Sequence, residues 1–184
     1  MKKWILILLA VVVVGGGAFV YYVRNANTEP LEIGATAPDF TTTGALAGKE
    51  FQFSLADKLK DGPVVLYFFP KVFTEGCTIE ANMFAEATAD FNAAGATVIG
   101  MSGDDIDGLK KFSTSECRDK FAVAQADDKI IADYQVRMAP GLAMTNRTSY
   151  VIGQDGKIAF VHSAMKPEGH VTGTLEKVKQ LSKS

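Results

Sequence analysis

An uncharged apolar run dominates the start of the chain. It extends from Trp4 to Val23 without an acidic or basic side chain, and Lys2 and Lys3 precede it. A helix of about 20 residues, rising 1.5 Å per residue, spans roughly 30 Å, which is the thickness of the hydrocarbon core of a bilayer. Basic residues before such a helix keep its N-terminal side in the cytoplasm. The run therefore predicts a transmembrane helix that holds the rest of the protein at a membrane, outside the cytoplasm, in a bacterial periplasm.

A second interpretation of the same segment is a cleaved signal peptide. Gly16 and Ala18 would be the small residues before the cleavage site, and the mature protein would then be secreted or periplasmic. Cleavage there would leave the apolar residues 19–23 at the new N-terminus, so the uncleaved anchor is the favoured interpretation. The expected organisation is an anchor with the start of a tether at residues 1–28 and one domain at residues 29–184.

In the remaining chain, the pattern of apolar and polar residues alternates between segments typical of strands and segments typical of helices. Continuous apolar runs at residues 63–69 and 96–102 predict strands that are buried on both faces. Hairpins are expected over residues 40–55 and, with Asp155-Gly156 at the turn, over residues 148–162. Strands and helices in alternation, followed by a hairpin and a last helix, predict an α/β fold with three layers. The expected helices cover residues 78–93, 105–115 and 169–181.

Composition and net charge exclude some classes of function. Of 184 residues, 47% are hydrophobic and 22% are charged, which is typical of a globular protein. The formal charge of −2 offers no basic excess for phosphates, so a nucleic-acid partner is not expected. The two Cys and two His residues show no zinc-ligand spacing, and neither a metal nor an organic cofactor is expected.

Cys77 lies where the first buried strand is expected to meet its helix. The first backbone N–H groups of a helix are unpaired there and the helix dipole is positive, so a thiolate is stabilised. A buried, unreactive thiol is the competing interpretation, and position alone does not separate the two.

The residues around Cys77 favour a reactive thiolate over a buried, unreactive thiol. The segment FFPKVFTEGCTIE resembles the P-K-x-F-T-x-G-C-T-x-E pattern of peroxiredoxins of the bacterioferritin comigratory (Q-type) group. Further on, NRTSYVIGQDGKI resembles the R-x-T-F-V-I-D-x-x-G-x-I segment of that family and GHVTGTLEKVKQL its C-terminal helix. The resemblance covers about residues 31 to 181. The residues that match the first pattern are Pro70, Lys71, Phe73, Thr74, Gly76, Cys77, Thr78 and Glu80.

The resemblance implies a thioredoxin-like fold and a thiol-dependent peroxidase. Cys77 would be the peroxidatic cysteine, and Thr74 would bond the thiolate and the peroxide. Arg147 would supply a fixed positive charge, and Pro70 would exclude water from the pocket. The implied partners are a hydroperoxide substrate and a thioredoxin-like protein reductant.

One position departs from the pattern of the family, and the role of Glu80 within it is open. Many Q-type members carry a second cysteine five residues after the first, where this chain has Asn82. Other members use a cysteine in the next helix, so Cys117 is the candidate resolving residue, although it can also be a spare thiol. For Glu80, an ion pair with an arginine of the site and a favourable contact with the helix dipole are both open.

Other functions on the same fold fit less well. A thiol–disulfide oxidoreductase needs C-x-x-C, but Thr74 occupies the first position. A copper-delivery protein would need C-x-x-x-C, but Ala81 occupies the second position. A non-catalytic binding module anchored to a membrane leaves the Thr74-x-x-Cys77 spacing without a purpose.

Overall fold

The computed structural model describes residues 9–14, 17–22 and 29–183. Within residues 29–183, a seven-stranded sheet has the order β4-β3-β7-β6-β5-β8-β9. The central pairs β5–β6 and β6–β7 are parallel, and the remaining pairs are antiparallel. The strands are β3 (Thr41–Leu46), β4 (Lys49–Ser54), β5 (Val64–Phe68), β6 (Thr97–Ser102), β7 (Ala122–Gln125), β8 (Thr148–Ile152) and β9 (Ile158–Ser163).

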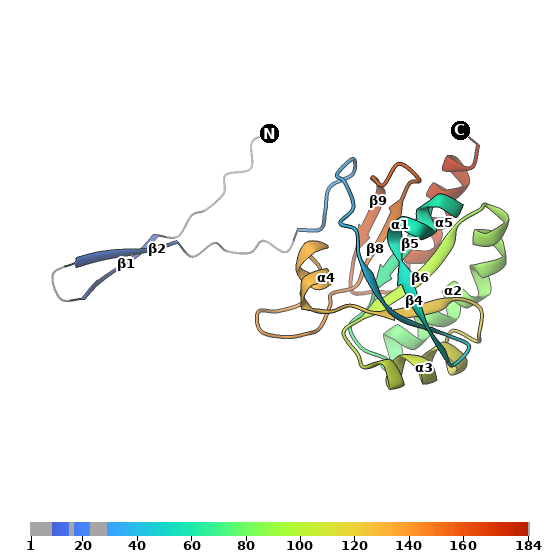
Figure 1. Cartoon of the computed structure of the whole chain (residues 1–184), viewed down its shortest axis with the longest axis horizontal. Helices are drawn as coiled ribbons and strands as arrows, with labels where there is room; N and C mark the ends of the chain where they lie inside the picture. Colours follow the sequence, from blue (N-terminus) through green and yellow to red (C-terminus); the bar gives the residue numbers. More distant parts are fainter. Residues whose placement is uncertain (1–8, 15–16, 23–28, 184) are drawn as a thin grey trace.

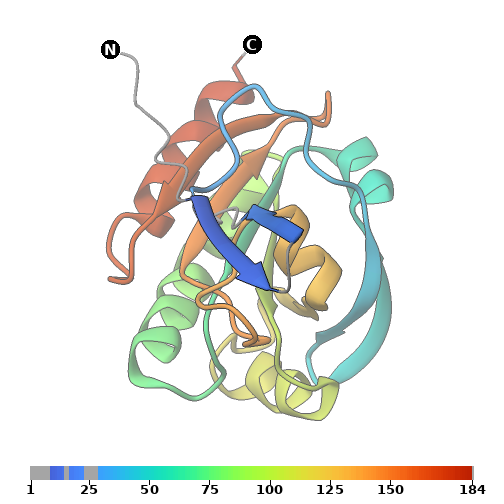
Figure 2. The same cartoon turned by 90° about the vertical axis from the view of Figure 1, so that its left-hand side faces the viewer.

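Five helices of these described residues cover the two faces of the sheet, which gives the three layers that the alternation predicts (Figure 1). The side chains of β5 are all buried and alternate between the faces, with Tyr67 in one apolar cluster and Phe68 in the other. Figure 2 looks onto the face that α4 covers. α2, α3 and α5 pack on the Tyr67 face, and α1 and α4 pack on the Phe68 face. The helices are α1 (Leu55–Asp61), α2 (Glu75–Ala93), α3 (Ile106–Ser115), α4 (Asp128–Asp133) and α5 (His170–Leu181).

The predicted transmembrane helix over residues 4–23 is wrong where the structure describes that segment. Leu9–Val14 (β1) and Gly17–Tyr22 (β2) are antiparallel strands, with Val11 opposite Val20. β-branched valines favour strands over helices because their χ1 angle is restricted in a helix. Across the described residues, no helix has the length and apolar character that crossing a membrane requires. The predicted membrane-anchored localisation depends on that helix, so this prediction is also wrong.

The predicted helices and hairpins of the domain agree with the structure, with small differences at their ends. α2 begins at Glu75 rather than Thr78, and Asp105 caps α3 through its side chain, which accepts from the Gly108 N–H at 2.7 Å. The hairpin after β8 is longer than two residues. It closes with bonds from Gly153 N to Lys157 O and from Gly156 N to Gly153 O.

Candidate active site

Cys77 lies in the first turn of α2, on the side of the helix that faces the sheet. Its side chain is 1% exposed and belongs to the apolar cluster under α2, α3 and α5. The helix is capped by the backbone of Thr74, whose carbonyl accepts from the Thr78 N–H at 2.9 Å. The Thr74 side chain makes no capping bond. The N–H groups of the first turn therefore keep their donor capacity beside a buried sulfur.

Arg147 approaches the sulfur from the start of β8, on a different element. Its Nη2 donates to Cys77 Sγ at 3.4 Å, and its Nε donates to the Met165 carbonyl at 3.0 Å. Its Nη1 donates to Glu80 Oε2, which completes a three-way clamp on a guanidinium that is 3% exposed. Gly76 leaves room for this group, because a Cβ there would lie 3.1 Å from Nη2. A cation held in this way presents a fixed charge to the sulfur.

Glu80 is the buried counterion of that guanidinium. The side chain is fully buried, one turn after Cys77 on the same face of α2. Burial raises the pKa of Glu80 to about 8, although Arg147 acts in the opposite direction. Of the two roles that the sequence left open, the structure shows the ion pair with an arginine.

His170, the first residue of α5, lies behind Glu80. Its Nε2 lies 2.9 Å from the Ala164 carbonyl, which can only accept, so Nε2 carries the proton. Nδ1 then accepts from the Ser149 hydroxyl at 2.8 Å and lies 3.7 Å from Glu80 Oε1. Glu80 Oε1 has no hydrogen-bond partner among the described residues. Burial lowers the pKa of His170 to about 4, in keeping with a neutral ring.

The neutral state of His170 predicts a pH dependence of stability. A histidine with its pKa lowered from 6.5 to about 4 stabilises the fold above pH 6.5 and loses that contribution as the pH falls towards 4. The free energy of unfolding, measured by urea denaturation, is expected to fall by up to about 3 kcal/mol over that range from this residue. His170→Gln is expected to flatten the slope.

Glu80 titrates with the opposite sign between about pH 4.5 and 8, because its pKa is raised. It is present in the wild type and in His170→Gln, so its contribution cancels from the comparison to first order. Equal slopes for His170→Gln and the wild type would contradict the assignment of a neutral buried His170.

Thr74 and Pro70 lie on the loop between β5 and α2, shortly before Cys77. Thr74 is exposed, and its hydroxyl donates to the Lys71 carbonyl at 3.1 Å. Its lone pairs stay available to a substrate that enters from solvent. Pro70 is half-buried and lies two residues after the end of β5.

Asp104, two residues after the end of β6, fixes the same loop. It accepts from Lys71 Nζ at 2.7 Å and from the Val72 N–H at 2.8 Å. Phe73 has a φ of 58°, a left-handed conformation that is rare for a bulky residue, and its ring packs edge-on against Phe112. The loop before Cys77 is thus held by polar contacts at one end and an aromatic contact at the other.

Cys117 lies just after α3 and is fully buried. Its thiol and that of Cys77 are both free, and both belong to the same apolar cluster. Burial, with Glu116 and Asp119 nearby, raises the pKa of the Cys117 thiol well above its ordinary value. Cys117 is therefore a protonated thiol at rest and a poor nucleophile.

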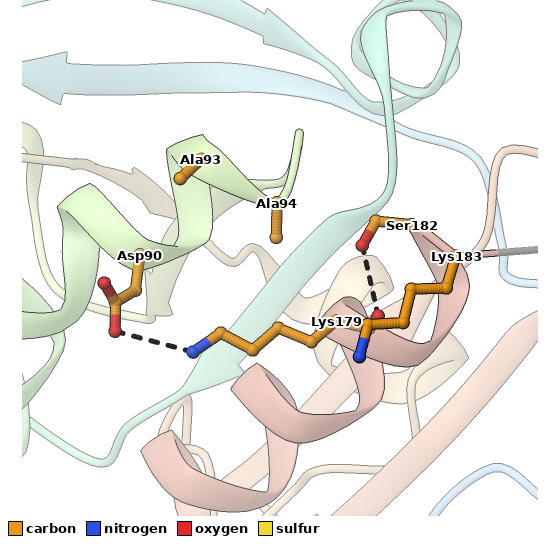
Figure 3. Close-up of a pocket in the computed structure, with 6 residues that line it drawn as sticks. All are labelled: Asp90, Ala93, Ala94, Lys179, Ser182 and Lys183. Carbon is orange, nitrogen blue, oxygen red and sulfur yellow. Dashed lines mark hydrogen bonds and ion pairs between the residues drawn. The ribbon is translucent and has the colours of Figure 1, made fainter.

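A cavity at the opposite end of α2 has no part in this site. Figure 3 shows it between the C-terminal ends of α2 and α5, where Lys179 Nζ lies 3.6 Å from Asp90 Oδ2. Neither a cysteine nor a histidine lines it. In the described part of the chain, no three acidic, histidine or cysteine side chains are grouped closely enough to hold a metal ion.

The structure thus joins Cys77 and Arg147 directly, places Thr74 one turn away, and leaves Cys117 in an adjoining part of the core. Sequence reasoning missed Ser149 altogether and assigned His170 no role in the site. The signal for them was weak, because Ser149 is one polar residue in a buried strand and His170 merely begins a helix. The Met165 carbonyl carries no sequence signal at all.

Comparisons with known proteins identify the family to which the sequence and the fold of this chain are similar. The pattern of the AhpC/TSA family matches residues 33–161. Peroxiredoxin Q, chloroplastic, of Suaeda salsa is 33% identical over 149 residues, which cover 80% of this chain and 68% of that protein. The putative peroxiredoxin bcp of Helicobacter pylori is 33% identical over 154 residues, covering 80% of this chain and 98% of the relative. The crystal structure of peroxidoxin BcpB from Mycobacterium tuberculosis superposes with a TM-score of 0.74 at 29% identity, covering 82% of this chain and 98% of that one.

Proposed function

The chain belongs to the AhpC/TSA family and is a thiol-dependent peroxidase of the peroxiredoxin Q type, and we propose that Cys77 is its peroxidatic cysteine within a catalytic unit formed by residues 29–184. The observation that carries the assignment is the contact of 3.4 Å between Arg147 Nη2 and Cys77 Sγ, two side chains that are both buried. A guanidinium in that place stabilises a thiolate and can orient the oxygens of a peroxide.

The first chemical step is an attack by the Cys77 thiolate on the terminal oxygen of a hydroperoxide. A sulfur–oxygen bond forms as the oxygen–oxygen bond breaks, so the sulfur is oxidised to a sulfenic acid. The leaving oxygen departs as an alkoxide or hydroxide and takes up a proton, giving an alcohol or water. Hydrogen peroxide and organic hydroperoxides are both substrates of such a step.

Thiolate formation alone does not account for catalysis. A thiol of ordinary acidity is about 3% ionised at pH 7, so complete ionisation gains only about 30-fold, whereas enzymes accelerate reactions by about a millionfold or more. The remainder must come from stabilising the oxygen that is transferred. We assign that role to Arg147, to the Thr74 hydroxyl and to the N–H groups of the first turn of α2. Pro70 would help to exclude water from the site without offering a donor of its own.

Cys117 is the proposed resolving cysteine. The chain contains two Cys residues, so no other thiol of the same chain can react with the sulfenic acid of Cys77. Attack by the Cys117 thiolate forms a disulfide and releases the sulfenic oxygen as water after protonation. A thioredoxin-like dithiol would then reduce the disulfide and itself become oxidised.

Addition of one equivalent of peroxide to the reduced protein is expected to form a disulfide between Cys77 and Cys117. The measurement is mass spectrometry of the alkylated, unreduced protein, which detects the crosslinked peptides. Cys117→Ser is the matched control, in which Cys77 should accumulate as a sulfenic acid or, with excess peroxide, as a sulfinic acid. A stable Cys77 sulfenic acid beside a free Cys117 in the wild type would refute the resolving role while leaving the peroxidase assignment intact.

A further inference from the structure

The segment that carries Cys117 is fastened to α2 by side chains on both sides of the cysteine. Arg118 Nε donates to Asn82 Oδ1 at 2.8 Å, and Arg118 Nη2 lies 3.2 Å from Glu86 Oε1. On the other side of Cys117, Asn82 Nδ2 donates to Glu116 Oε2 at 3.5 Å. We call the four residues Asn82, Glu86, Glu116 and Arg118 the resolving-segment clamp.

The clamp joins the Cys117 segment to α2 beyond the turn that holds Cys77. Asn82 and Glu86 follow Cys77 by five and nine positions on the same helix, which at 1.5 Å per residue is roughly 8 to 14 Å along its axis. A disulfide requires Cα atoms within about 7 Å of each other. The segment around Cys117, the first turn of α2, or both must therefore move before the disulfide can form.

The backbone after Cys117 is poised for such a movement. Arg118 and Asp119 both have left-handed φ angles, 52° and 57°, which non-glycine residues rarely adopt. The Arg118 side chain is 44% exposed and that of Glu86 is 70% exposed, so water can replace their contacts as the segment opens. Opening also brings the Cys117 thiol out of the apolar cluster and into contact with water. The thiol loses its proton more easily there than in the core.

We propose that Asn82 and Arg118 are positioning residues that set the rate of the resolving step by holding the Cys117 segment closed against α2. The inference rests on the proposed function, because it requires Cys117 to resolve the sulfenic acid of Cys77. Contacts of this exposed kind are individually weak, so the clamp delays the opening moderately rather than preventing it. The delay prolongs the life of the sulfenic acid, which excess peroxide can then oxidise further.

The test compares Arg118→Ala and Asn82→Ala with the wild type after rapid mixing with one equivalent of hydrogen peroxide. The reaction is quenched with an alkylating reagent at successive times, and mass spectrometry follows sulfenic acid and disulfide separately. Both variants are expected to form the disulfide three- to tenfold faster, with sulfenic acid forming at the wild-type rate. At excess peroxide, both should give proportionally less sulfinic acid.

Lys110→Ala is the matched control, because it removes an ion pair with Glu50 from the same helix α3, away from the clamp. It should leave both rates unchanged. Asn82 also donates to the Thr78 carbonyl in α2, so Arg118→Ala, which spares that bond, is the decisive variant. Unchanged or slower disulfide formation in Arg118→Ala, or equal acceleration in Lys110→Ala, would overturn the inference. Failure of the wild type to form the disulfide would instead remove the resolving role itself, and the inference with it.

Discussion

Replacement of Cys77 by serine is expected to reduce peroxide consumption to the rate of the reductant alone. Serine keeps the size of the side chain, but an alcohol stays protonated at neutral pH and its oxygen cannot accept an oxygen atom from a peroxide. The contact with Arg147 and the burial of residue 77 should survive, so the fold is expected to remain intact. The measurement is consumption of hydrogen peroxide with dithiothreitol as the reductant.

Cys117→Ser is the control for this experiment, since it removes the other thiol of the chain. With dithiothreitol present, this variant should keep the first oxidation step, because an external thiol can reduce the sulfenic acid. Substantial turnover in Cys77→Ser would show that the proposed mechanism is wrong. Loss of activity in both variants at the first step would indicate that the two thiols act together rather than in sequence.

Replacement of Arg147 by alanine is expected to lower the second-order rate of peroxide reduction by at least tenfold, and up to the hundredfold or more seen when one preorganised donor is lost. The guanidinium is also the partner of Glu80, which lies at the same depth in the core. Removing it leaves a buried carboxyl without its cation, and breaking such a pair costs about 3–5 kcal/mol where the charge persists. The loss of stability should be smaller at pH 6, where Glu80 can take up a proton, than at pH 9.

Two further variants separate catalysis from stability. Arg147→Lys keeps the charge but cannot reach Cys77, Glu80 and the Met165 carbonyl at once, so it should fold and still lose at least tenfold in rate. Arg147→Ala combined with Glu80→Gln should recover much of the stability without recovering the activity. Peroxide reduction is measured by stopped flow and stability by urea denaturation. Wild-type rates in Arg147→Lys would contradict the role of the planar guanidinium.

The environment of Arg147 explains why this one arginine can contribute both to the stability of the fold and to peroxide reduction. Met165 and Glu80 hold two edges of the guanidinium, which leaves one nitrogen directed at the sulfur. Behind them, Ser149 and the Ala164 carbonyl hold His170 in one orientation against Glu80. His170 thus restrains Glu80, and Glu80 restrains Arg147. Little reorganisation is therefore needed when charge develops at the sulfur.

Local pattern determined much of the domain. The uninterrupted apolar run of β5 is sufficient to predict a buried strand that leads into a helix, with Cys77 at the junction of the two. These features depend on neighbours within a few residues, where periodicity and capping rules apply. The resemblance of the Pro70–Glu80 segment supplied the family for the same reason, since its residues are contiguous.

Tertiary structure decided the features that join distant residues. Arg147 is 67 positions from Glu80 and 70 from Cys77, and Ser149 is 21 from His170, so no local rule predicts those contacts. Likewise, the packing of α3 determines that residues on both sides of Cys117 reach α2 at Asn82. In the N-terminal segment, hydropathy predicted a helix, but hydropathy is blind to backbone conformation, and the described residues of this valine-rich segment pair as strands. Apolar character depends only on side chains, whereas the choice between helix and strand depends also on how the backbone groups find partners.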